Sequence, residues 1–232
     1  MIERYSVGVT ARQLAERFGI DEPPAHQARY NAAPSQLLPV ITHESPNGFS
    51  FFYWGQPPDW SKNKSAAEKI INTRSELLAE KPLLKKNLVQ HRCLVPSDGF
   101  YAWKRIGKKT LIPWRFALKD KSIFSMAGLW EEYDDEENNS FHTFTIITTP
   151  SSKFVSAVCE RMPAIIQVSS EKSWLDKGAT ESELISLLSA SPDDKMDGFA
   201  VSPQLNTISF DRPSLILPVP PADQFGNLTL FD

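Results

Sequence analysis

Four short segments combine polar and aromatic side chains in a pattern that suits a binding or catalytic site better than plain turns. Residues 71–76 place the amide of Asn72, the guanidinium of Arg74 and the carboxylate of Glu76 close together. A guanidinium can fork onto a phosphate or a carboxylate, and an amide both donates and accepts hydrogen bonds. Each segment lies beside an apolar run that reads as a strand, so we expect one site assembled from several loops. The four segments are residues 29–34, 71–76, 97–104 and 159–163.

Each segment also has a purely structural interpretation. Taken alone, residues 71–76 are read more readily as a turn held by an internal Arg74–Glu76 pair. After the turn at residues 98–99, alternation places Phe100 and Ala102 on one face of a strand and the neighbouring aromatic residues on the other, as in an ordinary core strand. Cys159 could act as a nucleophile beside a base, but a buried inert thiol is the more common state of a lone cysteine.

Two further stretches could contact nucleic acid. The loop from Trp54 to Trp60 is stiffened by prolines, and a Trp there could stack on an unpaired base or could cover a small hydrophobic cluster. A basic stretch follows, which suits either a groove that follows a DNA strand or a solvated helix face. It comprises Lys81, Lys85, Lys86, His91 and Arg92.

Composition excludes several classes of protein. The chain has 232 residues and a net charge of −3, so it is not a broadly basic duplex-DNA binder, which needs excess Lys and Arg. Two cysteines without metal-ligand spacing argue against a disulfide scaffold and against a zinc site, and we expect no metal and no cofactor. The N-terminus lacks a signal peptide and no apolar run is long enough to span a membrane, which predicts a cytoplasmic protein without a membrane partner.

The local patterns predict an α+β fold with a sheet-rich, barrel-like core and peripheral helices, in a single domain over residues 1–232. Thr10 with Gln13 and Thr180 with Glu183 form capping boxes that open two helices, Gly19 ends the first, and Ser169 or Ser170 caps a third helix containing Trp174. Strands adjacent in sequence are expected to pair antiparallel. The expected strands cover residues 37–41, 49–53, 92–95, 100–105, 112–118, 123–130, 141–148 and 164–168.

Taken in order, the segments resemble the SOS response-associated peptidase (SRAP) family of abasic-site processing proteins. The resemblance extends from Arg4 to about Asn206, which leaves residues 207–232 as a C-terminal extension. It rests on RYNAAP at 29–34, WG…PP.W at 54–60, INTRSE at 71–76, SDGFYAWK at 97–104, ITT at 147–149 and ERMP at 160–163.

The resemblance implies a specific activity. Members bind single-stranded DNA, especially at abasic sites, and expose an N-terminal Cys after the initiator Met is removed. The amine of that Cys attacks the ring-opened sugar aldehyde, and its thiol closes a stable thiazolidine, so that the protein is crosslinked to DNA. An Asn, a Glu and a His around the aldehyde assist.

Carried over residue by residue, the reactive positions of the family differ in this chain. Ile2 stands at the Cys position, Ala102 at the Glu position and Cys159 at the His position, while the Asn is retained as Asn72. Ile2 offers no thiol, and its bulk should prevent removal of the initiator Met. The positions that hold DNA in the family all match: Arg4, Pro34, Trp60, Asn72, Arg74, Thr148 and Arg161.

The sequence therefore predicts a monomeric SRAP-fold protein that keeps a groove for single-stranded DNA, with the covalent chemistry lost or altered. One alternative is an active enzyme that forms a Schiff base through the Met1 amine or uses the thiol of Cys159 as the nucleophile. The second of these routes needs a base from among four histidines that no motif places: His26, His43, His91 and His142. A third interpretation is a scaffold without DNA on the same fold, because a fold does not determine function.

Overall fold

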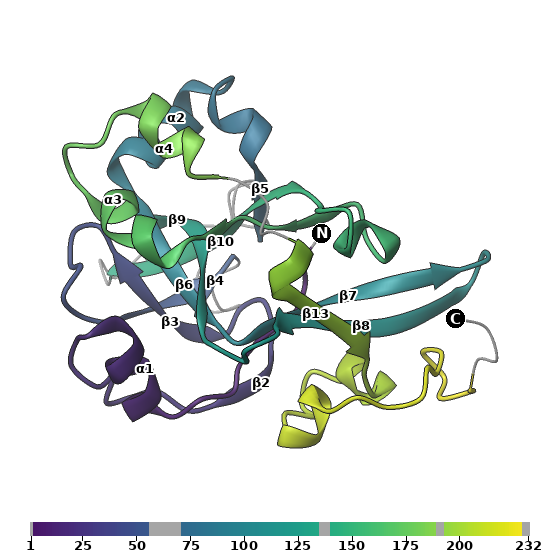
Figure 1. Ribbon diagram of the computed structural model, residues 1–232. Coiled ribbons are helices and arrows are strands. Elements are labelled where there is room, and N and C mark those ends of the chain that lie inside the picture. The colour runs from purple at the N-terminus through teal and green to yellow at the C-terminus, as the bar shows by residue number, and fades with distance from the viewer. Residues whose placement is uncertain (1, 56–70, 135–139, 189–192, 229–232) are drawn as a thin grey trace.

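A closed ring of five strands forms the centre of the protein in a computed structural model, which describes residues 2–55, 71–134, 140–188 and 193–228. The ring runs β10–β4–β3–β6–β9 and closes by pairing of β9 with β10. This barrel, with helices at its periphery, confirms the expected α+β fold (Figure 1). The strands are β3 (Leu37–Thr42), β4 (Ser50–Trp54), β6 (Arg92–Ser97), β9 (Phe124–Asp134) and β10 (Ser140–Pro150).

A second sheet packs beside the barrel in the order β13–β8–β7–β1–β2. Its two long strands, β7 and β8, form an antiparallel hairpin whose far end extends away from the barrel (Figure 1). One large core cluster includes residues of both sheets, such as Tyr5 and Phe100 from the second sheet and Trp54 and Phe144 from the barrel. The strands are β1 (Tyr5–Val7), β2 (Arg29–Ala32), β7 (Gly99–Ile106), β8 (Thr110–Leu118) and β13 (Met196–Ala200).

The helices begin largely where the sequence predicts. Thr10 and Thr180 form complete capping boxes at α1 (Ala11–Phe18) and α4 (Glu181–Ser186), and Gly19 ends α1 in the left-handed conformation with φ of 66°. Ser170 precedes α3 (Glu171–Leu175), but its side chain makes no capping hydrogen bond. Helix α2 (Pro82–Gln90) packs on the same side of the barrel as α4, and a second core cluster lies beneath these helices.

Three of the four polar segments contain short strands, so the expectation of a site built from loops was wrong. The strands are β2, β5 (Asn72–Arg74) and β11 (Arg161–Pro163). Both β5 and β11 pair with the C-terminal half of β10, β5 in parallel and β11 antiparallel. Strand periodicity does not reveal strands this short, because three or four residues are too few to show alternation.

Strands adjacent in sequence that pair with each other do so antiparallel, as expected, for example β3 with β4 and β9 with β10. The parallel pairs join β10 to β4 and β5, which lie far from it in the chain. The predicted strand at 164–168 contains only the two-residue β12 (Ile165–Ile166), because a 3-10 turn at Val168–Ser170 follows it. The alternation predicted for β7 is confirmed, since Phe100 and Ala102 join the main core while Tyr101 belongs to a third cluster.

Two residues of the proposed nucleic-acid stretches lie in the interior instead. The Arg92 side chain is fully buried and donates to backbone carbonyls, including those of Trp174 and Asp176, so it cannot line a groove. Trp54 is also fully buried, and its Nε1 donates to the carbonyl of Ile71 at 2.9 Å. Trp60 and most of that loop lie outside the described residues.

The C-terminal segment is joined to the RYNAAP motif. The Asn31 side chain donates through Nδ2 to the carbonyls of Leu205, Thr207 and Phe210, each at 3.1 Å. The carboxylate of Asp211 accepts from the backbone N–H groups of Tyr30 and Asn31. Much of the polar character of this motif therefore serves to hold residues 205–211 against the second sheet.

Candidate functional site

The N-terminus is anchored by Asn72, the one retained reactive residue of the predicted site. Asn72 opens β5, and its Nδ2 donates to the carbonyl of Ile2 at 2.7 Å. The Ile2 side chain is fully buried in the main core. The other polar atom of Asn72, Oδ1, is buried and has no hydrogen-bond partner among the described residues. Asn72 thus offers an unused acceptor beside an apolar residue 2.

A cavity of about 410 Å³ opens next to this point, where the N-terminal residues meet β7. It brings together Ala102 and Cys159, which the sequence placed at the positions of the family's Glu and His. It also includes Arg4, one of the predicted DNA-holding residues. The cavity is lined by Glu3, Arg4, Ala102, Trp103, Arg105, Leu111, Cys159 and Asn206.

Cys159 is half-buried at the wall of this cavity, after the 3-10 turn at Val155–Ala157. Its Sγ donates to the carbonyl of Arg161 at 3.3 Å. Burial raises the pKa of the thiol. This effect outweighs smaller effects that lower the pKa, such as hydrogen bonding to Ser151. None of the histidines lines the cavity, so the thiol has no imidazole base there. These features favour a neutral thiol with low nucleophilicity.

Arg161 is held by a second cluster at the end of β10. Its guanidinium forks onto Glu76, with Nη1–Oε1 and Nη2–Oε2 distances of 2.9 and 2.8 Å. It also donates to the hydroxyl and the carbonyl of Thr148. The Arg161 guanidinium, which donates to both carboxylate oxygens, lowers the pKa of Glu76 to about 2. The expected Arg74–Glu76 pair was wrong, because strand pairing brings Arg161 of β11 to Glu76 and leaves Arg74 on the outside.

The remaining predicted DNA-holding residues differ in how accessible they are. Arg74 is exposed and has no ion pair among the described residues. Arg4 and Pro34 are half-buried, and Nη1 of Arg4 donates to the carbonyl of Glu3. Thr148 is buried, so its contact with Arg161 suits a supporting role. Trp60 lies outside the described residues.

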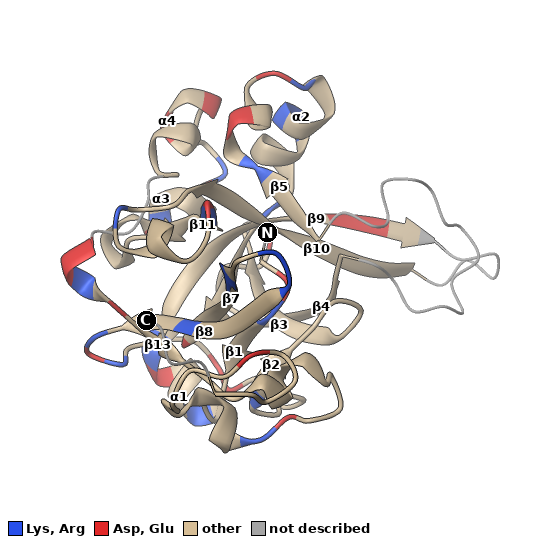
Figure 2. Cartoon of the chain, turned by 90° about the vertical axis from the view of Figure 1, so that its right-hand side faces the viewer, with Lys and Arg blue, Asp and Glu red and all other residues tan. Residues whose placement is uncertain are grey.

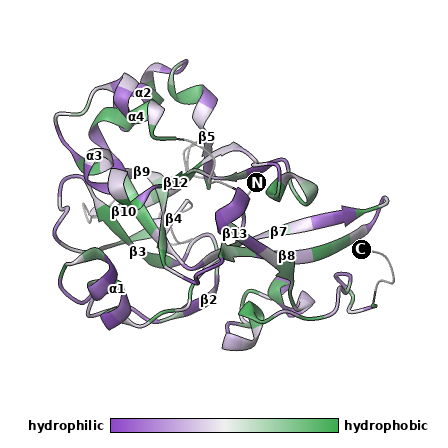
Figure 3. Cartoon of the chain, in the orientation of Figure 1, coloured by the Kyte–Doolittle hydropathy of each residue, from purple (hydrophilic) through white to green (hydrophobic). Residues whose placement is uncertain are grey.

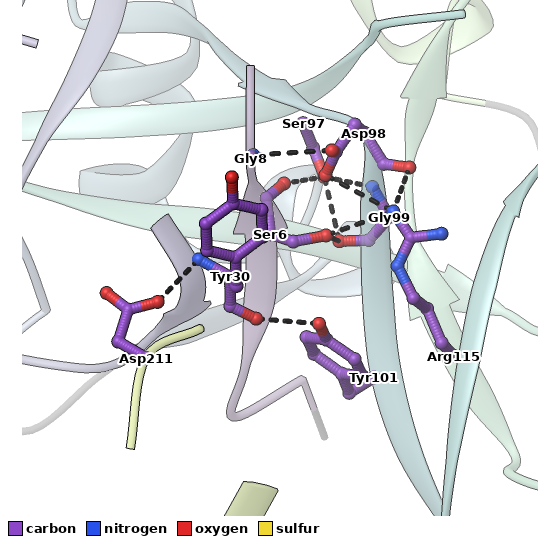
Figure 4. Close-up of polar contacts among 9 residues, drawn as sticks. All are labelled: Ser6, Gly8, Tyr30, Ser97, Asp98, Gly99, Tyr101, Arg115 and Asp211. Carbon is purple, nitrogen blue, oxygen red and sulfur yellow. Dashed lines mark hydrogen bonds and ion pairs between the residues drawn. The ribbon is translucent and has the colours of Figure 1, made fainter. Parts of the chain in front are cut away.

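The SDGFY motif has a structural role in this arrangement. Its residues lie where β6 passes into β7, and they hold β1 in place (Figure 4). Ser97 Oγ donates to the carbonyl of Ser6, and Arg115 from β8 donates to the carbonyl of Asp98 and to Ser6 Oγ. An added Cβ on Gly99 would lie 2.5 Å from Cζ of Arg115, so any larger residue here would displace the buried guanidinium. The network fixes β1 and therefore the path of residues 2–4 into the cavity.

Sequence reasoning missed two charged residues near the site, Glu3 and Arg105, and it assigned Glu76 to the wrong partner. Glu3 and Arg105 line the cavity, and Glu76 forms the ion pair with Arg161. Glu76 stands inside a recognised motif, which was a usable signal. Glu3 and Arg105 stand outside any chemical pattern, and only the meeting of the N-terminal segment with β7 makes them neighbours.

A larger cavity of about 1060 Å³ lies on another part of the molecule, lined by residues of α1, α3 and the barrel such as Phe18, Ile41 and Leu175. Of the site residues named from the sequence and described in the structure, His43, one of the four possible bases, lines it. The described residues include no group of three or more His, Cys, Asp or Glu side chains placed to hold a metal ion. Among these same residues, no helix is both long and apolar enough to cross a membrane.

The fold recurs in solved structures. A crystal structure of a protein from Bacteroides thetaiotaomicron superposes with a TM-score of 0.83 at 27% sequence identity, covering 93% of this chain and 99% of that one. A protein from Bordetella bronchiseptica shares the fold with a TM-score of 0.71 at 20% identity, covering 86% of this chain and 99% of that one.

Sequence comparison finds relatives that are named as abasic site processing proteins. The chain is 37% identical over 221 residues to the abasic site processing protein YoqW of Bacillus subtilis, covering 93% of this chain and 99% of that protein. It is 26% identical over 237 residues to the abasic site processing protein HMCES of Rattus norvegicus, covering 85% of this chain and 67% of that protein.

The family model described as SOS response associated peptidase (SRAP) matches residues 1–208. The chain therefore belongs to the SRAP family, and the resemblance found in its motifs is confirmed.

Proposed function

We propose that this protein binds single-stranded DNA at abasic sites as a monomer in the DNA-damage (SOS) response, without the covalent capture that the family resemblance implies at residue 2. The relatives named as abasic site processing proteins support an abasic-DNA ligand. Arg74, exposed and without an ion pair among the described residues, is suited to hold a phosphate beside the site.

One observation carries the non-covalent part of the proposal. The cavity next to the N-terminus has Ala102 and Cys159 in its wall, and the residue leading into it is a buried Ile2 held by Asn72. An apolar side chain at residue 2 supplies no thiol to close a ring on an aldehyde, and a methyl group at residue 102 supplies no proton. The contrast between an exposed Arg74 that can hold a phosphate and a cavity wall without the reactive groups supports binding without a covalent step.

A second candidate function rests on Cys159, because its thiol lines the same cavity. Addition of the S–H group across the aldehyde C=O forms a C–S bond and leaves the proton on the oxygen, giving a hemithioacetal. That addition is reversible, and the raised pKa of Cys159 keeps the thiolate fraction low near neutral pH.

The test is incubation with an abasic single-stranded oligonucleotide, with and without borohydride, followed by a denaturing gel. We expect no adduct under either condition, and salt-sensitive binding in solution that Arg74→Ala weakens. A heat-stable adduct without reductant would contradict the proposal. An adduct only with borohydride would indicate Schiff-base chemistry through an amine. Absence of any binding would leave a scaffold role on the same fold.

A further inference from the structure

The β7–β8 hairpin presents an open strand edge next to the cavity. Strand β1 pairs with the start of β7, and the last contact is the Tyr101 N–H donating to the carbonyl of Arg4 at 3.1 Å. Beyond Tyr101, no strand of the described residues pairs with this side of β7. Because backbone groups alternate in direction along a strand, the N–H groups of Trp103 and Arg105 point to the same open side as that of Tyr101.

The far half of this hairpin is cationic. Residues 103–114 contain Lys104, Arg105, Lys108 and Lys109, and they contain no Asp or Glu. Arg105, Lys108 and Lys109 are exposed and make no salt bridge with any described residue. The end of the hairpin is accordingly blue in Figure 2 and hydrophilic in Figure 3.

The cationic strip is continuous with the candidate site. Arg105 and Leu111 are cross-strand partners, and both line the cavity that contains Ala102 and Arg4. The neighbouring Lys104 side chain lies on the other face of β7, with its Nζ 5.3 Å from the centre of the Trp114 ring. A ligand held in the cavity could therefore continue along the hairpin without leaving cationic surface.

The groups around the cationic strip leave it open to a ligand. Of the residues that line the cavity, Glu3 is the acidic one. The C-terminal segment covers the opposite edge of the hairpin, where Gln224 accepts from the N–H of Leu111 and donates to the carbonyl of Lys109. The nearby carboxylate of Asp223 accepts hydrogen bonds within its own turn, from Asn227 among others. One edge of the hairpin is thus covered by the chain and the other is open.

We propose that the open edge of β7 and the exposed cations of the hairpin bind the phosphates of DNA flanking the nucleotide in the cavity, on one side only. This inference rests on the proposed function and adds a second contact surface to it. Guanidinium, ammonium and backbone N–H groups are the donors that phosphates accept from in protein–DNA contacts. From Ala102 at the cavity to Ile106, where β7 ends, the strand advances by four residues, which is about 13 Å at about 3.3 Å per residue, and the turn that carries Lys108 and Lys109 follows.

The test compares oligonucleotides with one abasic site and flanks of three or nine nucleotides, lengthened on each side separately. The variant is the double substitution K108S and K109S, which leaves the cavity-lining Arg105 in place. Its control is K172S and K177S, which changes the charge equally at exposed positions away from the hairpin. Binding is measured by fluorescence anisotropy from about 50 to 200 mM salt.

We expect the wild-type protein and the control to gain affinity when one flank, and not the other, is lengthened. The hairpin variant should bind the short-flank oligonucleotide as the wild type does, but without that gain. Two phosphate contacts at about 0.7 each contribute about 1.4 to the slope of log affinity against log salt, so over this fourfold salt range the long-flank affinity of the wild type should fall roughly 7-fold more than that of the hairpin variant.

Equal flank dependence in wild type and hairpin variant would overturn this inference while leaving the proposed function intact, and it would point to an acidic protein as the partner of the hairpin. Equal loss on short and long flanks would also overturn it, because the cations would then act at the cavity itself. Failure of the wild type to bind the short-flank oligonucleotide would contradict the proposed function, and this inference with it.

Discussion

The ion pair between Glu76 and Arg161 provides a quantitative test of how the site is held. Replacing Glu76 with Gln keeps the shape of the side chain but removes the charge that Arg161 grips through two hydrogen bonds. The pKa of Glu76 falls from 4.5 to about 2. At about 1.4 kcal/mol per pKa unit this would correspond to about 3 kcal/mol for a pair shielded from water. The Glu76 side chain is 47% exposed, so screening reduces the expected value to about 1 kcal/mol.

The sign of the pH dependence follows from the lowered pKa. A carboxylate with a lowered folded-state pKa stabilises the protein above its unfolded-state pKa, and this contribution disappears as the pH falls through the folded-state value. Urea unfolding of wild type and Glu76→Gln should therefore differ by about 1 kcal/mol near pH 7, and the difference should vanish between about pH 4.5 and pH 2.

The matched control is Glu80→Gln, because Glu80 is exposed and has no salt bridge with any described residue. It should change the unfolding free energy little at either pH. A difference between wild type and Glu76→Gln that stays constant with pH would refute the ion-pair reasoning. Under the proposed function, Glu76→Gln should also strengthen oligonucleotide binding, since it frees Arg161 for a phosphate.

Three further outcomes follow from single contacts. Asn31→Ala removes three hydrogen bonds to the C-terminal segment, so we expect a loss of about 2–3 kcal/mol and faster proteolysis of residues 205–216, measured by unfolding and limited digestion. Gly99→Ala forces a Cβ against Arg115 and should cost about 1–3 kcal/mol in thermal unfolding; an unchanged midpoint would contradict the packing argument. Near neutral pH, Cys159 should react with iodoacetamide more slowly than a free thiol, and its reaction should become faster as the pH rises. Fully buried Cys93 should stay unmodified in the folded protein, and mass spectrometry measures both outcomes.

The comparison between the expected and observed strands shows where local pattern fails. The core strands of the barrel contain runs of apolar residues that are buried in any arrangement of the sheet, so these strands could be predicted from the sequence. Strands β5 and β11 have only three residues each, too few to show an alternating pattern, and they become strands because β10 is long enough to pair with both. Strand β5 pairs with residues 74 positions away along the chain, outside any local window of sequence, and β11 pairs with residues 11 to 15 positions away.

The sequence also did not predict which polar side chains are buried. Arg92 was expected on a basic surface, yet its guanidinium is buried among the carbonyls that end α2 and α3. A buried cation is stable there because several carbonyl oxygens replace its lost hydration, and those acceptors come from separate helices. Trp54 is buried for a similar reason, since its N–H donates to the carbonyl of Ile71 inside the core.

By itself, the sequence determined the family, the apolar strands, the capped helices and the identity of the residues at each motif position, since these are properties of residue type and short-range spacing. The absence of a thiol at residue 2, of a carboxylate at residue 102 and of an imidazole at residue 159 is also readable there. Only the tertiary structure decided that Glu76 binds Arg161 instead of Arg74, that Asn72 holds Ile2, and that Ala102 and Cys159 share a cavity with Glu3. The physical reason is that these contacts depend on closure of the barrel around β10 and on β1 entering beside β7, which are long-range pairings that no local pattern encodes.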